Sequence, residues 1–315
     1  MEKKTKYHQF PFYSRNCFDV KFPSLVMILT LLIAISSSPH SNGAEMLPTA
    51  TTFKVNVIGK GEPVILLPGL TSDQRVWQNL SAELSKTRQV HLINLAGCGK
   101  TPKIAQPSLT KVKAELIAYI EEKNLSKPTL IGHSLGGFMG FWLASSYPDQ
   151  IGDIISVDGL PFIGPVFSRT NKSTVESMAP QALQIKQMYN GMTVEQMIAQ
   201  ARYSLDIQAT SDEAKAQVIN MVKTSDPKTT GNAIVTLLKT DLRHQLHRIK
   251  SRILLLGASG GFTKPDEHAS IKQLYQEQLA DAANATLKMN TRAKHFIMLD
   301  DSAWLNQQVQ QFLDE

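Results

Sequence analysis

Residues 128–140 decide the fold: Pro128-Thr129-Leu130-Ile131-Gly132-His133-Ser134-Leu135-Gly136-Gly137-Phe138-Met139-Gly140. The stretch begins with apolar residues and continues with small ones, which predicts a buried strand, a tight turn at Ser134 and then a helix. Gly132 and Gly136 flank Ser134. Glycine suits these positions, because a strand that runs directly into a helix leaves little room for side chains. Ser134 is therefore predicted in a strained conformation at the carboxyl edge of a sheet, where the N–H groups of a helix start favour negative charge.

Short apolar runs alternate with amphipathic segments along most of the chain. Strands are predicted at 51–58, 63–67, 89–95, 151–157, 252–256 and 285–289, in addition to the strand before Ser134. Helices are predicted at 77–84, 108–123 and 265–280, and a closing helix begins at Asp301 or Ser302. This alternation predicts an α/β fold with a mostly parallel sheet that is flanked by helices on both faces.

The pattern changes between residues 162 and 248, where strand signals are absent. Amphipathic helices are predicted at about 174–189, 193–203, 211–223 and 227–240. Five methionines fall in this segment: Met178, Met188, Met192, Met197 and Met221. Methionine gives an adaptable apolar surface, although most of the five are expected only to pack the helices together.

The sequence Gly132-His133-Ser134-Leu135-Gly136-Gly137 resembles the nucleophile elbow of the α/β-hydrolase family, because a strand precedes it and a helix follows. The resemblance implies an α/β-hydrolase core of residues 45–161 and 249–315 with an inserted helical cap at 162–248. It also implies that Ser134 is the nucleophile and that His295, on the loop after the last strand, is its base. Serine needs such a base because its hydroxyl is a poor nucleophile at neutral pH.

The same resemblance implies an oxyanion hole made of two backbone N–H groups. One belongs to Leu70, which follows the turn Pro68-Gly69 after an early strand, and the other to Leu135, directly after the nucleophile. His133 is expected to be a packing residue that points away from the serine.

The acidic residue of the triad is where this sequence departs from the family pattern. The usual carboxylate follows the strand at 252–256, but Gly260 occupies that position. Some family members carry the acid one strand earlier, where this chain has Asp158. Asp158 is therefore preferred, with Asp266 and then Asp241 as alternatives, although an aspartate before glycine is also common in an ordinary turn.

These residues predict a hydrolase that cleaves a carboxylic ester of a small-molecule acyl substrate. A thioester, lactone, amide or carbon–carbon bond is an alternative substrate for the same triad, and a non-catalytic ligand-binding protein is an alternative of another class. No cofactor and no metal are expected, because His244 and His247 have no evident third ligand. Gly99-Lys100-Thr101 is not a phosphate-binding loop, since that motif needs a glycine where Asn94 stands.

The first 44 residues differ from the rest of the 315-residue chain. A basic start, an apolar run from Leu25 to Ile35 and a small-residue segment ending at Ala44 have the order of a secretory signal peptide. The expected product is secreted or periplasmic and has no stable membrane span, with an uncleaved anchor as the alternative. Cleavage would remove Cys17 and leave Cys98 alone, so no intramolecular disulfide is expected.

The net charge gives no support for a nucleic-acid partner. Without residues 1–44, 28 Lys and Arg stand against 25 Asp and Glu, so the formal charge falls from +6 to +3. No dense basic cluster is present in the remaining sequence.

Overall fold

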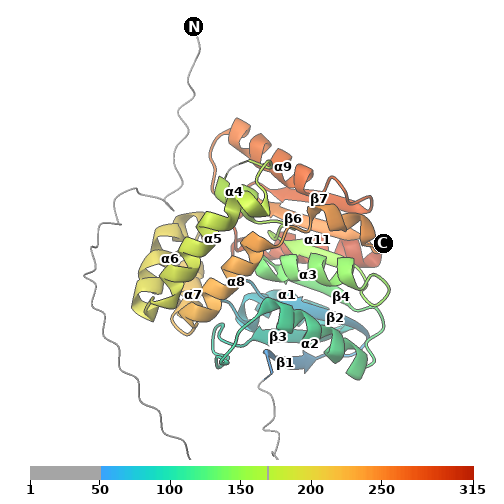
Figure 1. The fold of residues 1–315 in the computed structure, drawn as a ribbon. Helices are drawn as coiled ribbons and strands as arrows, with labels where there is room; N and C mark the ends of the chain where they lie inside the picture. The colour runs from blue at the N-terminus through green and yellow to red at the C-terminus, as the bar shows by residue number, and fades with distance from the viewer. Residues whose placement is uncertain (1–50, 169) are drawn as a thin grey trace, which may run out of the picture. The chain divides into compact units, whose positions relative to one another are not determined.

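A seven-stranded sheet with the order β1-β3-β2-β4-β5-β6-β7 forms the centre of the structure (Figure 1). β1 pairs antiparallel with β3 at one edge, and every other pairing is parallel. The strands are β1 (Phe53–Ile58), β2 (Glu62–Leu67), β3 (Arg88–Leu95), β4 (Thr129–His133), β5 (Ile154–Val157), β6 (Ile253–Ala258) and β7 (Ala285–Asn290).

This computed structural model describes residues 51–168 and 170–315, and residues 51–315 form one compact unit. The predicted signal peptide and Cys17 lie outside the described residues. No helix within the described residues is long and apolar enough to cross a membrane.

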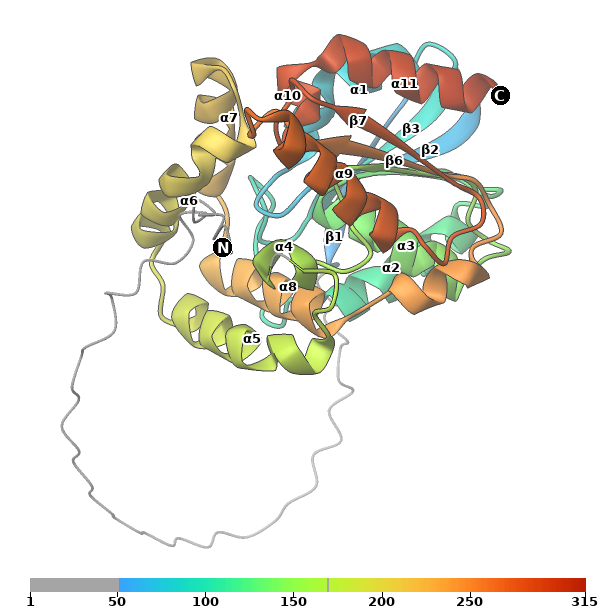
Figure 2. The same cartoon turned by 90° about the horizontal axis from the view of Figure 1, so that it is seen from above.

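Helices cover both faces of the sheet, as the β–α alternation predicts (Figure 2). Along β2, Val64 and Leu66 belong to the core under α1 and α11, whereas Ile65 and Leu67 belong to the core under α2, α3 and α9. Alternate residues of a strand point to opposite faces, so the uniformly apolar strands serve both cores. The core helices are η1 (Gln74–Trp77), α1 (Gln78–Leu84), α2 (Leu109–Glu122), α3 (Leu135–Ser146), α9 (Pro265–Gln278), α10 (Ile297–Asp300) and α11 (Ser302–Asp314).

A helical insertion lies between β5 and β6, in the segment where strand signals are absent from the sequence. It consists of α4 (Gly164–Ser168), α5 (Val175–Asn190), α6 (Val194–Gln208), α7 (Asp212–Val222), α8 (Pro227–Lys239) and η2 (Arg243–Arg248). The four long helices follow side-chain N-caps, which explains where they begin: Thr174, Thr193, Ser211 and Asp226.

Most of the methionines in the insertion pack helices together. Met178, Met197 and Met221 are buried, with at most 7% of each exposed. Met192 is partly buried against the same cluster as Met178, and Met188 is exposed. The packing role expected for most of them is therefore confirmed for the three buried side chains.

The turn between β4 and α3 is closed by backbone contacts that only glycine allows. A Cβ atom on Gly132 would lie 2.1 Å from the carbonyl carbon of Gly136, and one on Gly136 would lie 2.1 Å from the carbonyl oxygen of Leu67. Both neighbours are backbone atoms of the core, so neither can move aside without displacing a strand or the helix.

We therefore expect Gly132→Ala to lower the free energy of unfolding by at least about 3 kcal/mol, the upper range of overpacking substitutions. Gly191→Ala is the matched control, because a Cβ atom on Gly191 meets nothing within 4 Å. Urea unfolding of both variants checks the prediction. Equal stability of the two would mean that the turn is not closed as described.

Candidate active site

Ser134 lies at the sharp turn between β4 and α3 and is half-buried. Its backbone angles are φ 50° and ψ −111°, a region that costs a residue other than glycine free energy. Two hydrogen bonds hold it there: its N–H donates to Val157 O at 2.9 Å, and its carbonyl accepts from Phe138 N at 3.0 Å. The predicted strand, strained turn and helix are all present at this serine.

His295 and Asp158 are hydrogen-bonded to each other, although 137 positions separate them in the chain. His295 Nδ1 lies 2.7 Å from Asp158 Oδ2. The aspartate side chain is 8% exposed and the histidine side chain 31%. A carboxylate accepts hydrogen bonds when ionised, so Nδ1 carries the proton of this bond. No other residue within 51–168 and 170–315 is hydrogen-bonded to Nε2.

Asp158 reaches the histidine from the end of β5, next to the strand that leads to Ser134. Its backbone has φ 51°, and its N–H donates to Leu256 O at 2.7 Å. The hydrogen bond continues the parallel pairing of β5 with β6, whereas the positive φ turns the chain as it leaves the sheet. Asp158 is thus a turn residue and a partner of His295 at once, two roles that the sequence left as alternatives.

The other two candidate acids have different surroundings. Asp266 is exposed on the first turn of α9, and Asp241 forms an ion pair with Arg243 at 2.6 Å. Gly260, at the family's usual acid position, has no space for a side chain, because a Cβ atom there would lie 2.2 Å from Arg292 O.

His133 fixes the backbone of His295 next to Ser134. Its Nε2 lies 3.1 Å from His295 O, and the two rings have centroids 4.6 Å apart. Burial and the neighbouring His295 hold the pKa of His133 well below its usual value. It is therefore a neutral donor through Nε2. The expected packing role is correct, but its contact with His295 could not be read from the sequence.

No hydrogen bond in the described part of the chain joins Ser134 Oγ to His295. The sequence-based arrangement of Ser134, His295 and Asp158 is therefore present as a bonded His–Asp pair beside a separate serine. Such serine–histidine contacts are often long in the absence of substrate and shorten when it binds.

The turn after β2 lies against the serine and brings Leu70 to the site. A Cβ atom on Gly69 would lie 3.4 Å from Ser134 Cβ and 2.5 Å from His133 Nδ1. The N–H of Leu70 donates to no other group in residues 51–168 and 170–315. Leu135 is the first residue of α3, so its N–H has no acceptor within the helix. The oxyanion role of these two N–H groups stays a prediction.

Asp158 has two further partners that the sequence did not reveal. Its Oδ1 accepts the hydroxyl of Tyr275 at 2.7 Å and the N–H of Ala258 at 2.7 Å. Tyr275 lies in the last turn of α9, where its spacing marks it only as a core residue. A buried hydroxyl needs a hydrogen-bond partner, but the sequence does not say which one.

The Gly99-Lys100-Thr101 segment has no free backbone donors for a phosphate. Gly99 N donates to Ser225 Oγ at 2.9 Å, Lys100 N to Asp73 Oδ2 at 3.3 Å and Thr101 N to Cys98 O at 3.1 Å. A phosphate-binding loop needs such groups unpaired, so the loop instead joins the core to the helical insertion.

The described residues contain no group of three or more His, Cys, Asp and Glu side chains placed to hold a metal. Of the histidines considered as a metal pair, His244 instead contacts Asp281 at 3.0 Å on the surface.

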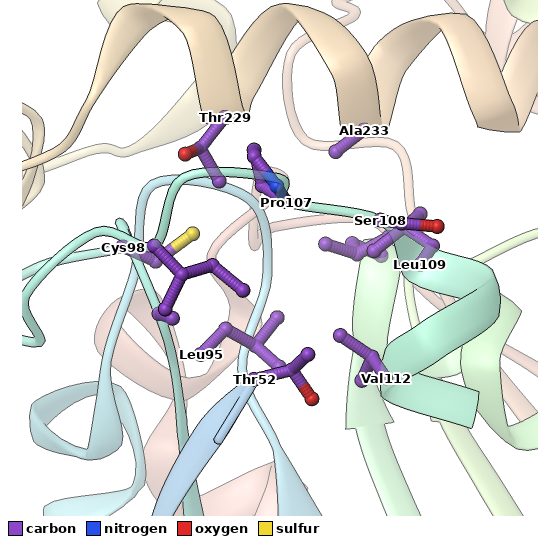
Figure 3. A pocket seen from close by; sticks show the side chains of 12 residues that line it. Thr52, Leu95, Cys98, Pro107, Ser108, Leu109, Val112, Thr229 and Ala233 are labelled. Atoms are coloured by element: carbon purple, nitrogen blue, oxygen red, sulfur yellow. The ribbon is translucent and has the colours of Figure 1, made fainter. Parts of the chain in front are cut away.

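An apolar cavity of about 30 Å³ lies between the core and α8, next to the elbow (Figure 3). Thr229 and Ala233 approach it from α8, and Leu135 contributes to its lining. Its volume is far below the several hundred Å³ of typical small-molecule sites. Cys98 also lines it, and burial raises the pKa of this thiol to about 11. Cys98 is therefore an inert filler, as expected from the sequence.

Comparison with known proteins agrees with this architecture. A family model for the alpha/beta hydrolase fold matches residues 62–302. The chain belongs to the α/β-hydrolase fold family.

The relatives and solved structures align with different portions of the chain. It is 27% identical over 193 residues to a pimeloyl-[acyl-carrier protein] methyl ester esterase of Aliivibrio salmonicida, which covers 61% of this chain and 71% of that protein. It is 32% identical over 119 residues to a 2-succinyl-6-hydroxy-2,4-cyclohexadiene-1-carboxylate synthase of an Enterobacter species, which covers 38% and 45%. The enol-lactonase of Burkholderia xenovorans shares the fold, with a TM-score of 0.65, 19% identity and coverage of 84% and 96%.

Proposed function

We propose that this protein is a serine hydrolase that cleaves a carboxylic ester through an acyl-enzyme, with Ser134 as nucleophile, His295 as base and Asp158 as the acid. The observation that carries the proposal is the 2.7 Å bond between His295 Nδ1 and Asp158 Oδ2, at the sheet edge where Ser134 occupies a strained turn. A carboxylate on Nδ1 fixes the histidine tautomer in which Nε2 can accept a proton.

The reaction follows from the positions of these groups. His295 Nε2 takes the proton of Ser134 Oγ while the oxygen attacks the acyl carbon. The oxyanion that forms accepts hydrogen bonds from the N–H groups of Leu70 and Leu135. His295 then donates the proton to the leaving alcohol. Water then attacks the acyl-enzyme while His295 Nε2 takes one of its protons. The nitrogen returns this proton to Ser134 Oγ as the bond to the acyl group breaks and the acid leaves.

The relatives support ester cleavage as the first choice among acyl reactions. The Aliivibrio protein is named for a methyl ester and the Burkholderia protein for an enol-lactone, which is a cyclic ester. The Enterobacter relative is named as a synthase. Membership of the family therefore does not by itself determine which reaction is catalysed.

Initial rates on a matched substrate panel test this choice. The panel contains p-nitrophenyl esters of rising acyl length, a thioester, a lactone and an anilide. We expect the highest kcat/KM on one of the esters. A preference for the anilide or thioester would replace the ester assignment, and no turnover of any of them would favour the ligand-binding alternative.

We also propose that the helical insertion acts as a cap that limits acyl size. Support comes from α8, since Thr229 and Ala233 lie against the cavity that Leu135 lines. A sharp fall of the rate above one chain length in the same panel is the expected sign of a cap, and a flat dependence would argue against one.

We propose export to the periplasm or the medium, on the order of basic, apolar and small residues in 1–44. The mature chain is expected to begin near Glu45, which the intact mass of exported protein checks. An unprocessed Met1 in the membrane fraction would instead identify an anchor.

Removing the nucleophile and the base should have strongly non-additive effects. Ser134→Ala and His295→Ala are each expected to lower kcat by about 10⁴ or more, with the double variant little worse than either. Steady-state kinetics on the best ester of the panel measure this. Small and additive losses would mean that the two residues do not act as a unit.

Asp158→Asn should cripple turnover while the protein stays folded, because an amide can hold the wrong histidine tautomer, at a cost of about 10⁴ in kcat. The matched control is Asp266→Asn, which changes an exposed carboxylate on α9 and should be nearly silent. The assignment of the acid is wrong if Asp266→Asn gives the larger loss of kcat.

A further inference from the structure

We infer that Tyr275 is a positioning residue of the proposed hydrolase: its hydroxyl holds the Asp158 carboxylate in the one rotation that presents Oδ2 to His295. The inference rests on the proposed function, because its effect on turnover passes through His295. It adds to the reaction a residue from α9 that lies 117 positions from the aspartate it orients.

The two oxygens of Asp158 have separate sets of partners. Oδ1 accepts from the Tyr275 hydroxyl and from the Ala258 N–H, both at 2.7 Å, whereas Oδ2 is 2.7 Å from His295 Nδ1. The Ala258 donor belongs to the end of β6 and the tyrosine donor to α9. Rotation of the carboxylate would break all three bonds, so the donors on Oδ1 keep Oδ2 directed at the histidine.

The location of Asp158 explains why it needs this support. Its backbone lies in the left-handed region at φ 51°, and its side chain is 8% exposed. Little water can reach the carboxylate, so its hydrogen bonds must come from donors of the protein. Burial and the neighbouring carboxylate raise the pKa of Tyr275 well above its usual value. The hydroxyl therefore remains protonated and can donate.

A second observation shows that the site is shaped around the tyrosine ring. A Cβ atom on Gly257 would lie 2.8 Å from Tyr275 Cδ1 and 2.6 Å from Met289 Sδ. The absence of a side chain on Gly257, in β6, thus makes room for the ring that reaches Asp158.

The main experiment compares Tyr275→Phe with Tyr189→Phe. Both tyrosines are 8% exposed, but Tyr189 belongs to the apolar cluster of the helical insertion. Tyr275→Phe is expected to lower kcat for a short p-nitrophenyl ester by about 10- to 100-fold, the range typical of groups that orient a functional residue. KM should stay within about twofold, because the hydroxyl does not contact substrate. Tyr189→Phe should leave both constants unchanged.

A double-variant cycle separates positioning from a general structural role. If the hydroxyl acts only through the carboxylate, Tyr275→Phe should cost almost nothing further in an Asp158→Asn background. The same loss of kcat in both backgrounds would overturn the inference, as would a folded Tyr275→Phe protein with the kcat of the unaltered enzyme.

Proton NMR gives a readout that does not require turnover. The His295 Nδ1 proton in its short bond to a carboxylate should give a downfield resonance in the unaltered protein. Tyr275→Phe should broaden or remove this resonance, and Tyr189→Phe should leave it in place. An unchanged resonance in Tyr275→Phe would contradict the inference.

If Tyr275→Phe does not fold, the unaltered protein and Asp158→Asn supply the test. The hydroxyl proton of Tyr275 should exchange slowly with water, and its NMR resonance should shift in Asp158→Asn. A resonance at the same position in both proteins would overturn the inference. Failure of the proposed function is recognised separately, because the unaltered protein would then not hydrolyse the ester, or Ser134→Ala would hydrolyse it equally well.

Discussion

The close approach of β4 and α3 is the constraint on which the rest of the site depends. Gly132 packs against the backbone of Gly136, and Gly136 packs against that of Leu67. Ser134, which connects the two elements, has a positive φ of 50°. The strain is held by hydrogen bonds to β5 and to the first turn of α3. The serine is consequently placed where the turn after β2 can approach it.

In the proposed triad the acid comes from the end of β5, and the packing after β6 gives a physical reason. A side chain at Gly260 would collide with the carbonyl of Arg292, so the loop after β6 packs directly on the loop that carries His295. The carboxylate that contacts His295 belongs to Asp158, at the end of β5. The neighbouring strand end contributes the Ala258 N–H, and Gly257 leaves the space in which Tyr275 reaches Asp158.

Much of the fold could be predicted from local patterns. Apolar runs and glycine turns located the strands, and amphipathic segments located the helices of the insertion. The caps that begin these helices, such as Thr174 and Asp226, are seen in the structure. The short helices α4 and α10 were not predicted, because four or five residues give too little periodicity to detect.

The site was predictable only where residue order carries the information. Ser134 and His295 follow from a motif and a position, whereas Asp158 was one of three carboxylates. Its bond to His295 depends on how two strand ends meet, which the sequence does not encode locally. The contacts of Tyr275 with Asp158 and of His133 with His295 join residues more than 100 positions apart. No spacing rule could have paired them.

The central claim is that Ser134 is an activated nucleophile, and covalent labelling tests it most directly. A fluorophosphonate forms a stable bond only with a serine whose proton is removed by a base, and peptide mass mapping identifies the modified residue. We expect one phosphonyl group per chain, carried by Ser134, and none after Ser134→Ala or His295→Ala. A folded protein that stays unlabelled, or one labelled at another residue, would contradict it.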